Sequence, residues 1–183
     1  MNRGYHEIKE HGKREFPFNI YPCSIPVDFS HVALHWHEEM EIIAVKKGKG
    51  RITVDTVSYP VEEGDILAVF PGQLHAISCG NGERMEYENI IFRLSMLMGD
   101  NGDGCTVHFL KPLQEGQAKN PVLIQRNQPD HEVFGKVIQE LDRFSEIRGN
   151  GYPLAVKGQL FLFLYYAYGR GILFTEKKPG HAR

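Results

Sequence analysis

Cysteine and long apolar runs are scarce in this sequence. The 183 residues include three cysteines, Cys23, Cys79 and Cys105, which are scattered and form no CxxC pair. An odd, dispersed set of this kind excludes a disulfide framework and favours a reducing compartment. The most apolar run, residues 160–168, is far shorter than the roughly 20 residues that span a bilayer. We therefore expect no membrane-spanning segment.

An excess of either charge is also missing. Lysine and arginine number 21 against 23 aspartates and glutamates, for a formal net charge of −2. Such a balance excludes a surface that coats nucleic acid by charge alone. The first 16 residues are polar and of mixed charge, unlike a signal peptide. These features predict a soluble cytoplasmic protein.

Short runs rich in Val, Ile, Phe and Tyr fill residues 31–125, separated by turns that contain Gly or Asp. They read HVALHWH, EIIAV, RITVD, VSYPV, DILAVF, HAISC, MEYENIIFRL, CTVHFL and PVLIQ. Strands this short and regular predict a sandwich or barrel, so the fold class is mainly β. Residues 1–30 are expected to form an extended arm, because three prolines in FPFNIYPCSIPVDF exclude a helix interior.

The apolar period changes in the segment 126–170. Residues 129–147 carry apolar side chains at helical spacing, the glycines of 149–151 interrupt them, and a second helix is expected from Pro153 to about Tyr168. Residues 171–183 are expected to begin a linker.

The stretch LHWHEEMEIIAVKKGKG places titratable side chains in an apolar run. In a strand, residues i and i+2 project from one face, so His35 and His37 share a face and the even spacing of Glu41 returns its carboxylate to it. His75, after the turn PGQL, offers another imidazole. Imidazoles with a carboxylate suit divalent metals. The alternative is that this face points to water, where polar side chains cost nothing to hold.

Two motifs carry a family resemblance. The spacing His35-x-His37-x-x-x-Glu41, with Gly48 after six further residues, resembles the first cupin motif, and GDILAVFPGQLH, which ends at His75, resembles the second. A cupin is a small jelly-roll barrel (a double-stranded β-helix) whose motifs supply three histidines and one glutamate to a single metal. The resemblance therefore implies that these four residues hold one divalent ion. Zn, Ni, Mn and Fe are not separated by this ligand set.

The motifs also depart from the cupin pattern. Phe29 replaces the usual opening glycine, Pro71 directly precedes Gly72, and Cys79 stands where the second motif often has asparagine. No ligand position is lost, but the departures indicate a branch away from the metalloenzymes.

The whole arrangement of arm, barrel and two helices resembles the N-terminal sensory half of an AraC-type transcriptional regulator. In that family the barrel binds a small effector, often a sugar, the arm folds over the pocket, and a helix mediates dimerisation. The paired helix-turn-helix units that bind DNA lie downstream. The resemblance implies that they would begin where this chain stops, at Arg183, so DNA is a partner only through a domain beyond this chain.

The second helix is apolar on all sides and must therefore be buried on all sides. We predict that it forms a two-fold homodimer interface through Leu160, Phe161, Phe163 and Leu164. The alternative is that both faces pack within the monomer.

Effector contacts are expected from polar side chains on the strands. Tyr87, Asn89 and Arg93 share one face of MEYENIIFRL, and Arg51 begins the strand after a glycine turn. Each offers a hydrogen bond to a hydroxylated effector, although exposure to solvent explains these residues equally well.

The leading functional hypothesis is an effector-binding and dimerisation domain of a regulator, with no catalytic residue. The alternative is a stand-alone metal-dependent cupin enzyme, such as a dioxygenase or sugar isomerase. A storage cupin has no specific feature in its favour. Sensing is preferred because no acid or base beyond the ligand set stands in a motif, and because an apolar helix and a linker-like tail follow the barrel.

Overall fold

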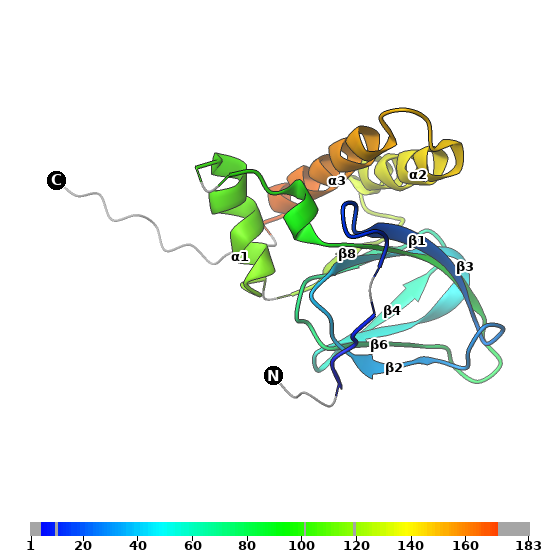
Figure 1. The fold of residues 1–183 in the computed structure, drawn as a ribbon. Coiled ribbons are helices and arrows are strands. Elements are labelled where there is room, and N and C mark those ends of the chain that lie inside the picture. The colour runs from blue at the N-terminus through cyan, green and yellow to red at the C-terminus, as the bar shows by residue number, and fades with distance from the viewer. Residues whose placement is uncertain (1–4, 10, 101, 119, 172–183) are drawn as a thin grey trace.

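The computed structural model describes residues 5–9, 11–100, 102–118 and 120–171 (Figure 1). The strands are β1 (Phe18–Ile25), β2 (Val32–His35), β3 (Met40–Val54), β4 (Val57–Glu62), β5 (Ile66–Val69), β6 (His75–Ser78), β7 (Met85–Phe92) and β8 (Val122–Ile124). The helices are the short η2 (Leu94–Leu97), η3 (Thr106–Leu110) and α1 (Lys111–Gln114), followed by the long α2 (His131–Ile147) and α3 (Tyr152–Gly169). No helix in these ranges is long and apolar enough to cross a membrane.

The strands close into a jelly-roll barrel with two walls. One wall, here called the helix-covered sheet, has the order β1-β7-β3-β5-β8, and the other, the second sheet, joins β2, β6, β4 and the end of β3. All pairings between these strands are antiparallel. The predicted fold class, a mainly β cupin jelly roll followed by two C-terminal helices, is confirmed.

The long strand β3 belongs to both walls and turns at Gly48. Its first half pairs with β5 and β7, and its second half, from Lys49 to Val54, pairs with β4. Gly48 has a φ of +76°, and a Cβ atom there would lie 2.1 Å from the carbonyl oxygen of Arg84. Only glycine fits this backbone position, which explains the glycine that follows the His-x-His-x-x-x-Glu spacing.

The two faces of the helix-covered sheet carry different side chains. Along β3, Met40 and Ile42 pack outward in the core beneath the helices, whereas Glu41 and Ile43 point into the barrel. This alternation follows from the period of two in a strand. Because both faces are buried there, residues 40–45 of β3 read as an almost continuous apolar run.

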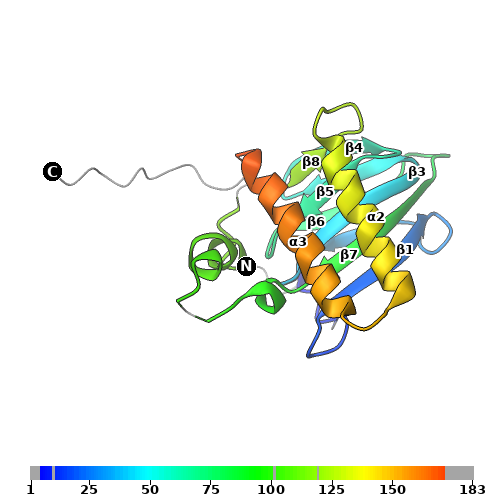
Figure 2. The same ribbon diagram turned by 90° about the horizontal axis from the view of Figure 1, so that it is seen from above.

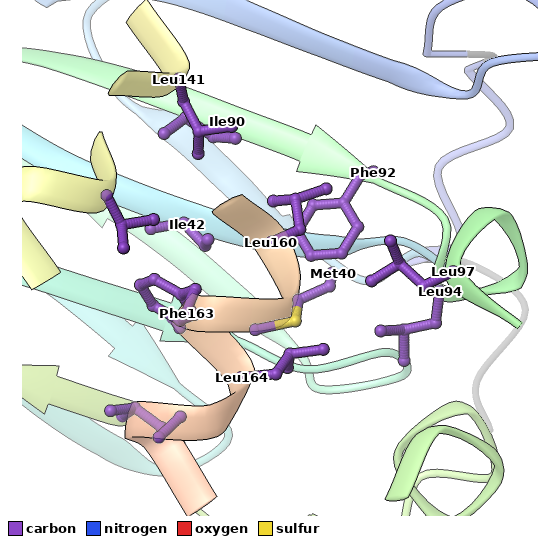
Figure 3. Close-up of a cluster of buried hydrophobic side chains, with 14 of the residues drawn as sticks. Met40, Ile42, Ile90, Phe92, Leu94, Leu97, Leu141, Leu160, Phe163 and Leu164 are labelled. Carbon is purple, nitrogen blue, oxygen red and sulfur yellow. The ribbon is translucent and has the colours of Figure 1, made fainter. Parts of the chain in front are cut away.

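Helices α2 and α3 lie side by side across the outer face of the helix-covered sheet (Figure 2). Leu160, Phe163 and Leu164 of α3 pack there against Met40 and other side chains of the sheet (Figure 3). They are 0%, 0% and 3% exposed. The structure therefore assigns three of the four predicted dimer-interface residues to the core of the monomer, because α3 needs them to cover the sheet.

The fourth predicted interface residue, Phe161, lies on the face of α3 that points away from the sheet. It is 39% exposed, and its neighbours Leu162 and Tyr165 are 42% and 70% exposed. The exposed apolar face of α3 thus consists of Leu154, Phe161, Leu162 and Tyr165.

The strand predicted for CTVHFL is wrong, because residues 106–110 are helical and continue into α1. The Asp103 carboxylate accepts hydrogen bonds from both the backbone N–H and the hydroxyl of Thr106, each at 2.7 Å. This local bonding starts a helical turn. Leu110 and Leu113 are buried, three residues apart, whereas Phe109 is exposed, which is a helical rather than an alternating pattern.

The boundary predicted between arm and barrel also moves. Strand β1 lies within residues 1–30 and pairs with β7 along its whole length, from Phe18 opposite Phe92 to Ile25 opposite Met85. β1 is therefore a strand of the barrel, and residues 5–9 and 11–16, which precede it, belong to the arm. The predicted linker lies outside the described residues from position 172 onward.

Candidate metal and effector site

The structure brings His35, His37, Glu41 and His75 together inside the barrel. One ligand atom from each of these residues lies within 4.8 Å of the corresponding atoms of the other three. His35 and His75 face each other across the β2–β6 pair, and Glu41 comes from β3 in the opposite wall. The side chains of His37, Glu41 and His75 are at most 2% exposed, and that of His35 is 20% exposed.

Backbone carbonyls orient all three imidazoles in the same way. Each Nδ1 lies within hydrogen-bonding distance of a main-chain oxygen two residues away: His35 with Ala33 (2.8 Å), His37 with Glu39 (3.1 Å) and His75 with Gln73 (2.9 Å). A carbonyl oxygen only accepts, so each Nδ1 carries a proton and donates it. The Nε2 atoms are left to face the cluster, which is the usual arrangement of metal-binding histidines.

Glu41 is the electrostatic centre of the cluster. Its Oε2 lies 2.9 Å from Nε2 of His37 and 3.1 Å from Nε2 of His75. Burial by itself would raise the pKa of Glu41, but the charge of His75 and the hydrogen bonds from His37 and His75 outweigh it, so the pKa falls well below its usual value. The carboxylate is therefore ionised at neutral pH.

The histidines respond in opposite directions. Burial lowers the pKa of His37, but hydrogen bonding to Glu41 and the charges of Glu41 and Glu39 outweigh burial and raise it above 6.5. Burial and the neighbouring His75 lower the pKa of His35 below 6.5. One ionised carboxylate thus faces two imidazoles, those of His35 and His37, whose pKa values shift in opposite directions.

The donor set fits one divalent ion. Three imidazole nitrogens and one carboxylate oxygen match the preferences of Zn, Ni, Mn and Fe. The fixed Nδ1–H donors add the outer hydrogen bonds that hold such ligands in place. These observations support the predicted ligand set, which nevertheless stays a prediction.

A cavity of about 370 Å³ lies beside the cluster, with His35 and Glu41 in its wall. Tyr87 and Asn89, two of the predicted effector contacts, line it from β7. Among the residues that the structure describes, the buried Oδ1 of Asn89 has no hydrogen-bond partner, and the Tyr87 hydroxyl has none except the weak thiol of Cys23. Buried polar atoms without partners cost free energy, so these two atoms are available to hydrogen-bond a ligand or a water molecule.

Arg51 and Arg93, the other two predicted contacts, lie outside this cavity. Arg51 is exposed on the second sheet and donates to the hydroxyl of Ser58 at 3.3 Å. Arg93 follows the last residue of β7, and its Nε donates to the buried carboxylate of Glu39 at 2.8 Å. The alternation that aligned Arg93 with Tyr87 and Asn89 ends with the strand at Phe92.

The family resemblance implied an arm over the pocket, but sequence reasoning named no arm residue as a contact. Glu7, Lys9 and His11 also line the cavity, at alternate positions of an extended segment. His11 is 5% exposed, and its Nδ1 lies 3.1 Å from the hydroxyl of Tyr21. The spacing of two between Glu7, Lys9 and His11 indicates that they share one face of the arm. It does not indicate which face turns toward the cavity, because that depends on how the arm pairs with Trp36.

A jelly-roll barrel with a cavity beside a buried donor cluster, an arm that contributes to the cavity lining and helices on one wall is the architecture of a ligand-binding domain. A sequence model of the AraC-like ligand binding domain matches residues 26–164, and this chain belongs to that family.

The individual proteins that resemble this chain match a smaller part of it than the family model does. An uncharacterised HTH-type transcriptional regulator of Bacillus subtilis, YdeC, is 27% identical over 88 residues, which is 48% of this chain and 30% of that protein. A cupin protein of Bacteroides fragilis is 25% identical over 47% of this chain and 70% of its own, with a TM-score of 0.35. A cupin 2 conserved barrel domain protein of Salinispora arenicola is 20% identical over 49% of this chain and 74% of its own, with a TM-score of 0.40.

Proposed function

We propose that this chain is the effector-binding and dimerisation domain of an AraC-type transcriptional regulator, acting in the cytoplasm on a helix-turn-helix part beyond the chain. Family membership and similarity to a transcriptional regulator support a regulatory role. The observation that carries the proposal is the barrel cavity, where the donor cluster adjoins the Tyr87 hydroxyl, bonded only to the weak thiol of Cys23, and the Oδ1 of Asn89, which has no partner among the described residues. An effector there completes hydrogen bonds that the protein leaves open.

The effector that fits best is a small hydroxylated molecule, and a sugar is the leading class. A volume of about 370 Å³ lies in the size range of small-molecule sites. A hydroxyl group of the effector donates to Oδ1 of Asn89, and another accepts from the Tyr87 hydroxyl. The aromatic and aliphatic wall formed by Phe29, Val32 and Ile91 contacts the carbon skeleton.

One divalent ion is proposed as the cofactor, held by His35, His37, Glu41 and His75. When bound, such an ion supplies a Lewis-acidic contact for an oxygen atom of the effector. The protein itself orients the three imidazoles through their Nδ1–H bonds and keeps the Glu41 carboxylate ionised.

Dimerisation is proposed through the outward face of α3 rather than through the residues that cover the sheet. Phe161, Leu162 and Tyr165 form this face, and Phe109 of η3 is exposed nearby across an apolar cavity of about 200 Å³. Contacts between such faces in a two-fold dimer bury apolar surface that water otherwise covers.

Effector binding and regulation are linked through the conformation of the arm and helices. An effector that prefers one placement of these elements shifts the population toward it, whereas equal affinity for both placements shifts nothing. The proposed output is the geometry in which the downstream DNA-binding parts are presented.

Calorimetric titration of the metal-loaded protein with a panel of sugars, polyols and hydroxy acids tests the proposal. We expect at least one compound to bind, and its affinity to fall about tenfold or more in Tyr87→Phe and Asn89→Ala, since each loses a buried hydrogen bond. Tyr59→Phe is the matched control, because Tyr59 lies on β4 away from the cavity lining. Catalytic turnover of a bound compound would instead support the metal-dependent enzyme.

A further inference from the structure

His37 is held differently from the other three residues of the donor cluster. His35 lies on β2, Glu41 on β3 and His75 on β6, where pairing with neighbouring strands fixes the backbone. His37 lies in the connection between β2 and β3, after the first strand ends at His35. A ligand side chain on a connection needs support from its surroundings to keep one orientation.

The main chain of Glu39 supplies part of that support. Its carbonyl oxygen lies 3.1 Å from Nδ1 of His37, and the carbonyl of His37 itself accepts from the N–H of Gly72 at 2.9 Å. The first contact orients the imidazole ring, and the second fixes the main chain from which the ring projects. The direction in which Nε2 of His37 points therefore depends on the position of the Glu39 backbone.

The side chain of Glu39 is a buried carboxylate. The residue is 3% exposed, although it lies in the same connection as Glu38, which is exposed. Removing a carboxylate from water is costly, and an apolar side chain of similar size would fill the same space without this cost. A buried charge at this position indicates a role other than packing.

Arg93 compensates the charge of Glu39 and anchors the connection. Its Nε donates to Oε1 of Glu39 at 2.8 Å, while Oε2 lies 3.8 Å from Nδ1 of His37. The backbone of Arg93 is itself fixed, because its N–H donates to the carbonyl oxygen of Pro17 and its carbonyl accepts from the N–H of Met96, both at 3.1 Å. Arg93 thus connects the segment that carries His37 to the end of β7.

We propose that Glu39, anchored by Arg93, is a positioning residue that holds His37 in its metal-binding orientation. This inference rests on the proposed metal site and adds a residue that acts on the ion through His37. An effect of charge alone would not depend on His37, because a carboxylate attracts a cation whether or not His37 is present. Variants that remove the charge, the hydrogen bond or His37 separate these two explanations.

Calorimetric titration of the full chain with Zn²⁺ tests the inference. Glu39→Ala removes the link to Arg93, and we expect Zn²⁺ affinity to fall about tenfold or more, as for other residues that orient metal ligands. Glu39→Gln loses the charge but keeps a side-chain oxygen that accepts from Nε of Arg93, so its affinity should stay within about threefold of native. Glu38→Ala, at the neighbouring exposed carboxylate, is the matched control and should bind like the native protein.

A second comparison uses His37→Ala as the starting protein. In that background Glu39→Ala should lower Zn²⁺ affinity no further, because a residue that acts through His37 has no effect once His37 is gone. A further loss of about tenfold there, or an equal loss in Glu39→Gln and Glu39→Ala, would overturn the positioning role.

Native-like affinity in Glu39→Ala would overturn this inference alone, whereas a native protein that binds no Zn²⁺ would overturn the proposed metal site as well. Urea denaturation in the presence of a chelator shows whether each variant folds. If Glu39→Ala does not fold, Arg93→Met replaces it, because this variant removes the same link from the other side, and the same loss of affinity is expected.

Discussion

The two faces of the helix-covered sheet are made from the same strands yet serve different ends. On the outer face, Met40 and Ile42 join Phe163 in an apolar core sealed by α2 and α3. On the inner face, Glu41 belongs to a buried cluster of titratable side chains, and the Oδ1 of Asn89 has no hydrogen-bond partner within the described part of the chain. Because alternate side chains of a strand point to opposite faces, neighbouring residues serve different purposes: one stabilises the core and the next lines the binding site.

The largest effect is expected from damage to the outer face. Phe163→Ala removes a fully buried ring, and we expect the free energy of unfolding to fall by about 3 to 5 kcal/mol. Metal stoichiometry of the protein that remains folded should not change, because Phe163 lies on the other side of the sheet. Urea denaturation and elemental analysis measure these two quantities.

Phe161→Ala is the matched control for Phe163→Ala, since it truncates the same residue type on the exposed face of the same helix. We expect a change of less than about 1 kcal/mol in the unfolding free energy of the monomer. Equal losses in the two variants would contradict the assignment of α3 faces.

A substitution on the inner face should have the opposite effect: a large loss of metal affinity and a small loss of stability. Glu41→Gln keeps the shape of the side chain but removes the charge, and we expect affinity for a divalent ion to fall by about 100-fold or more. The metal-free protein should lose less than about 2 kcal/mol, because glutamine fills the same space and can still hydrogen-bond to the imidazoles. Isothermal titration with Zn²⁺ and urea denaturation in the presence of a chelator test both parts. Full Zn²⁺ binding by Glu41→Gln would refute the ligand assignment.

The stability of the metal-free protein should depend on pH through Glu41 and His37, both on the inner face. The lowered pKa of Glu41 contributes stability that is present above its ordinary value of 4.5 and is lost as the pH falls toward the folded value. The raised pKa of His37 contributes stability that is present below its ordinary value of 6.5 and is lost as the pH rises through the folded value.

The stability difference between the native protein and Glu41→Gln should therefore be greatest between pH 4.5 and pH 6.5, the ordinary values of the two groups. Thermal unfolding at pH 4 to 8 in the presence of a chelator measures it. A difference that is constant with pH would show that Glu41 and His37 are not coupled.

The smallest effect is expected at the edge of the outer face. Nζ of Lys46 lies 2.6 Å from Glu88 and 2.9 Å from Asp142, and so links the sheet to α2. The side chain of Lys46 is 37% exposed, so water screens these ion pairs, and Lys46→Met should cost less than about 1 kcal/mol. Lys47→Met, at a more exposed pair with Glu86, is the control and should change the urea midpoint even less. A loss as large as that of Phe163→Ala would contradict the view that apolar packing holds this face.

The alternation of side chains along each strand predicted which residues of the inner face lie together. The i, i+2 rule placed His35 with His37, and Tyr87 with Asn89, on common faces, as the structure has them. His75 comes from a distant strand, and the resemblance to cupin motifs, rather than periodicity, indicated its place in the cluster.

What could not be predicted depends on contacts between distant parts of the chain. Glu7 faces the cluster because the arm pairs with Trp36, about 30 residues away in the chain. Phe163 and Phe161 belong to one uniformly apolar helix, and only its packing on the sheet distinguishes them. The helix at residues 106–110 was missed because the composition of this segment favours a strand, whereas the hydrogen bonds from Thr106 to the Asp103 carboxylate favour a helical turn.

A crystal structure of the full chain grown with Zn²⁺, with anomalous diffraction recorded at the zinc edge, tests the metal-centred cavity most directly. We predict one strong anomalous peak about 2.0 to 2.2 Å from Nε2 of His35, His37 and His75 and from the Glu41 carboxylate. A barrel that holds no peak at saturating Zn²⁺, or a peak bound only at surface residues, would contradict it.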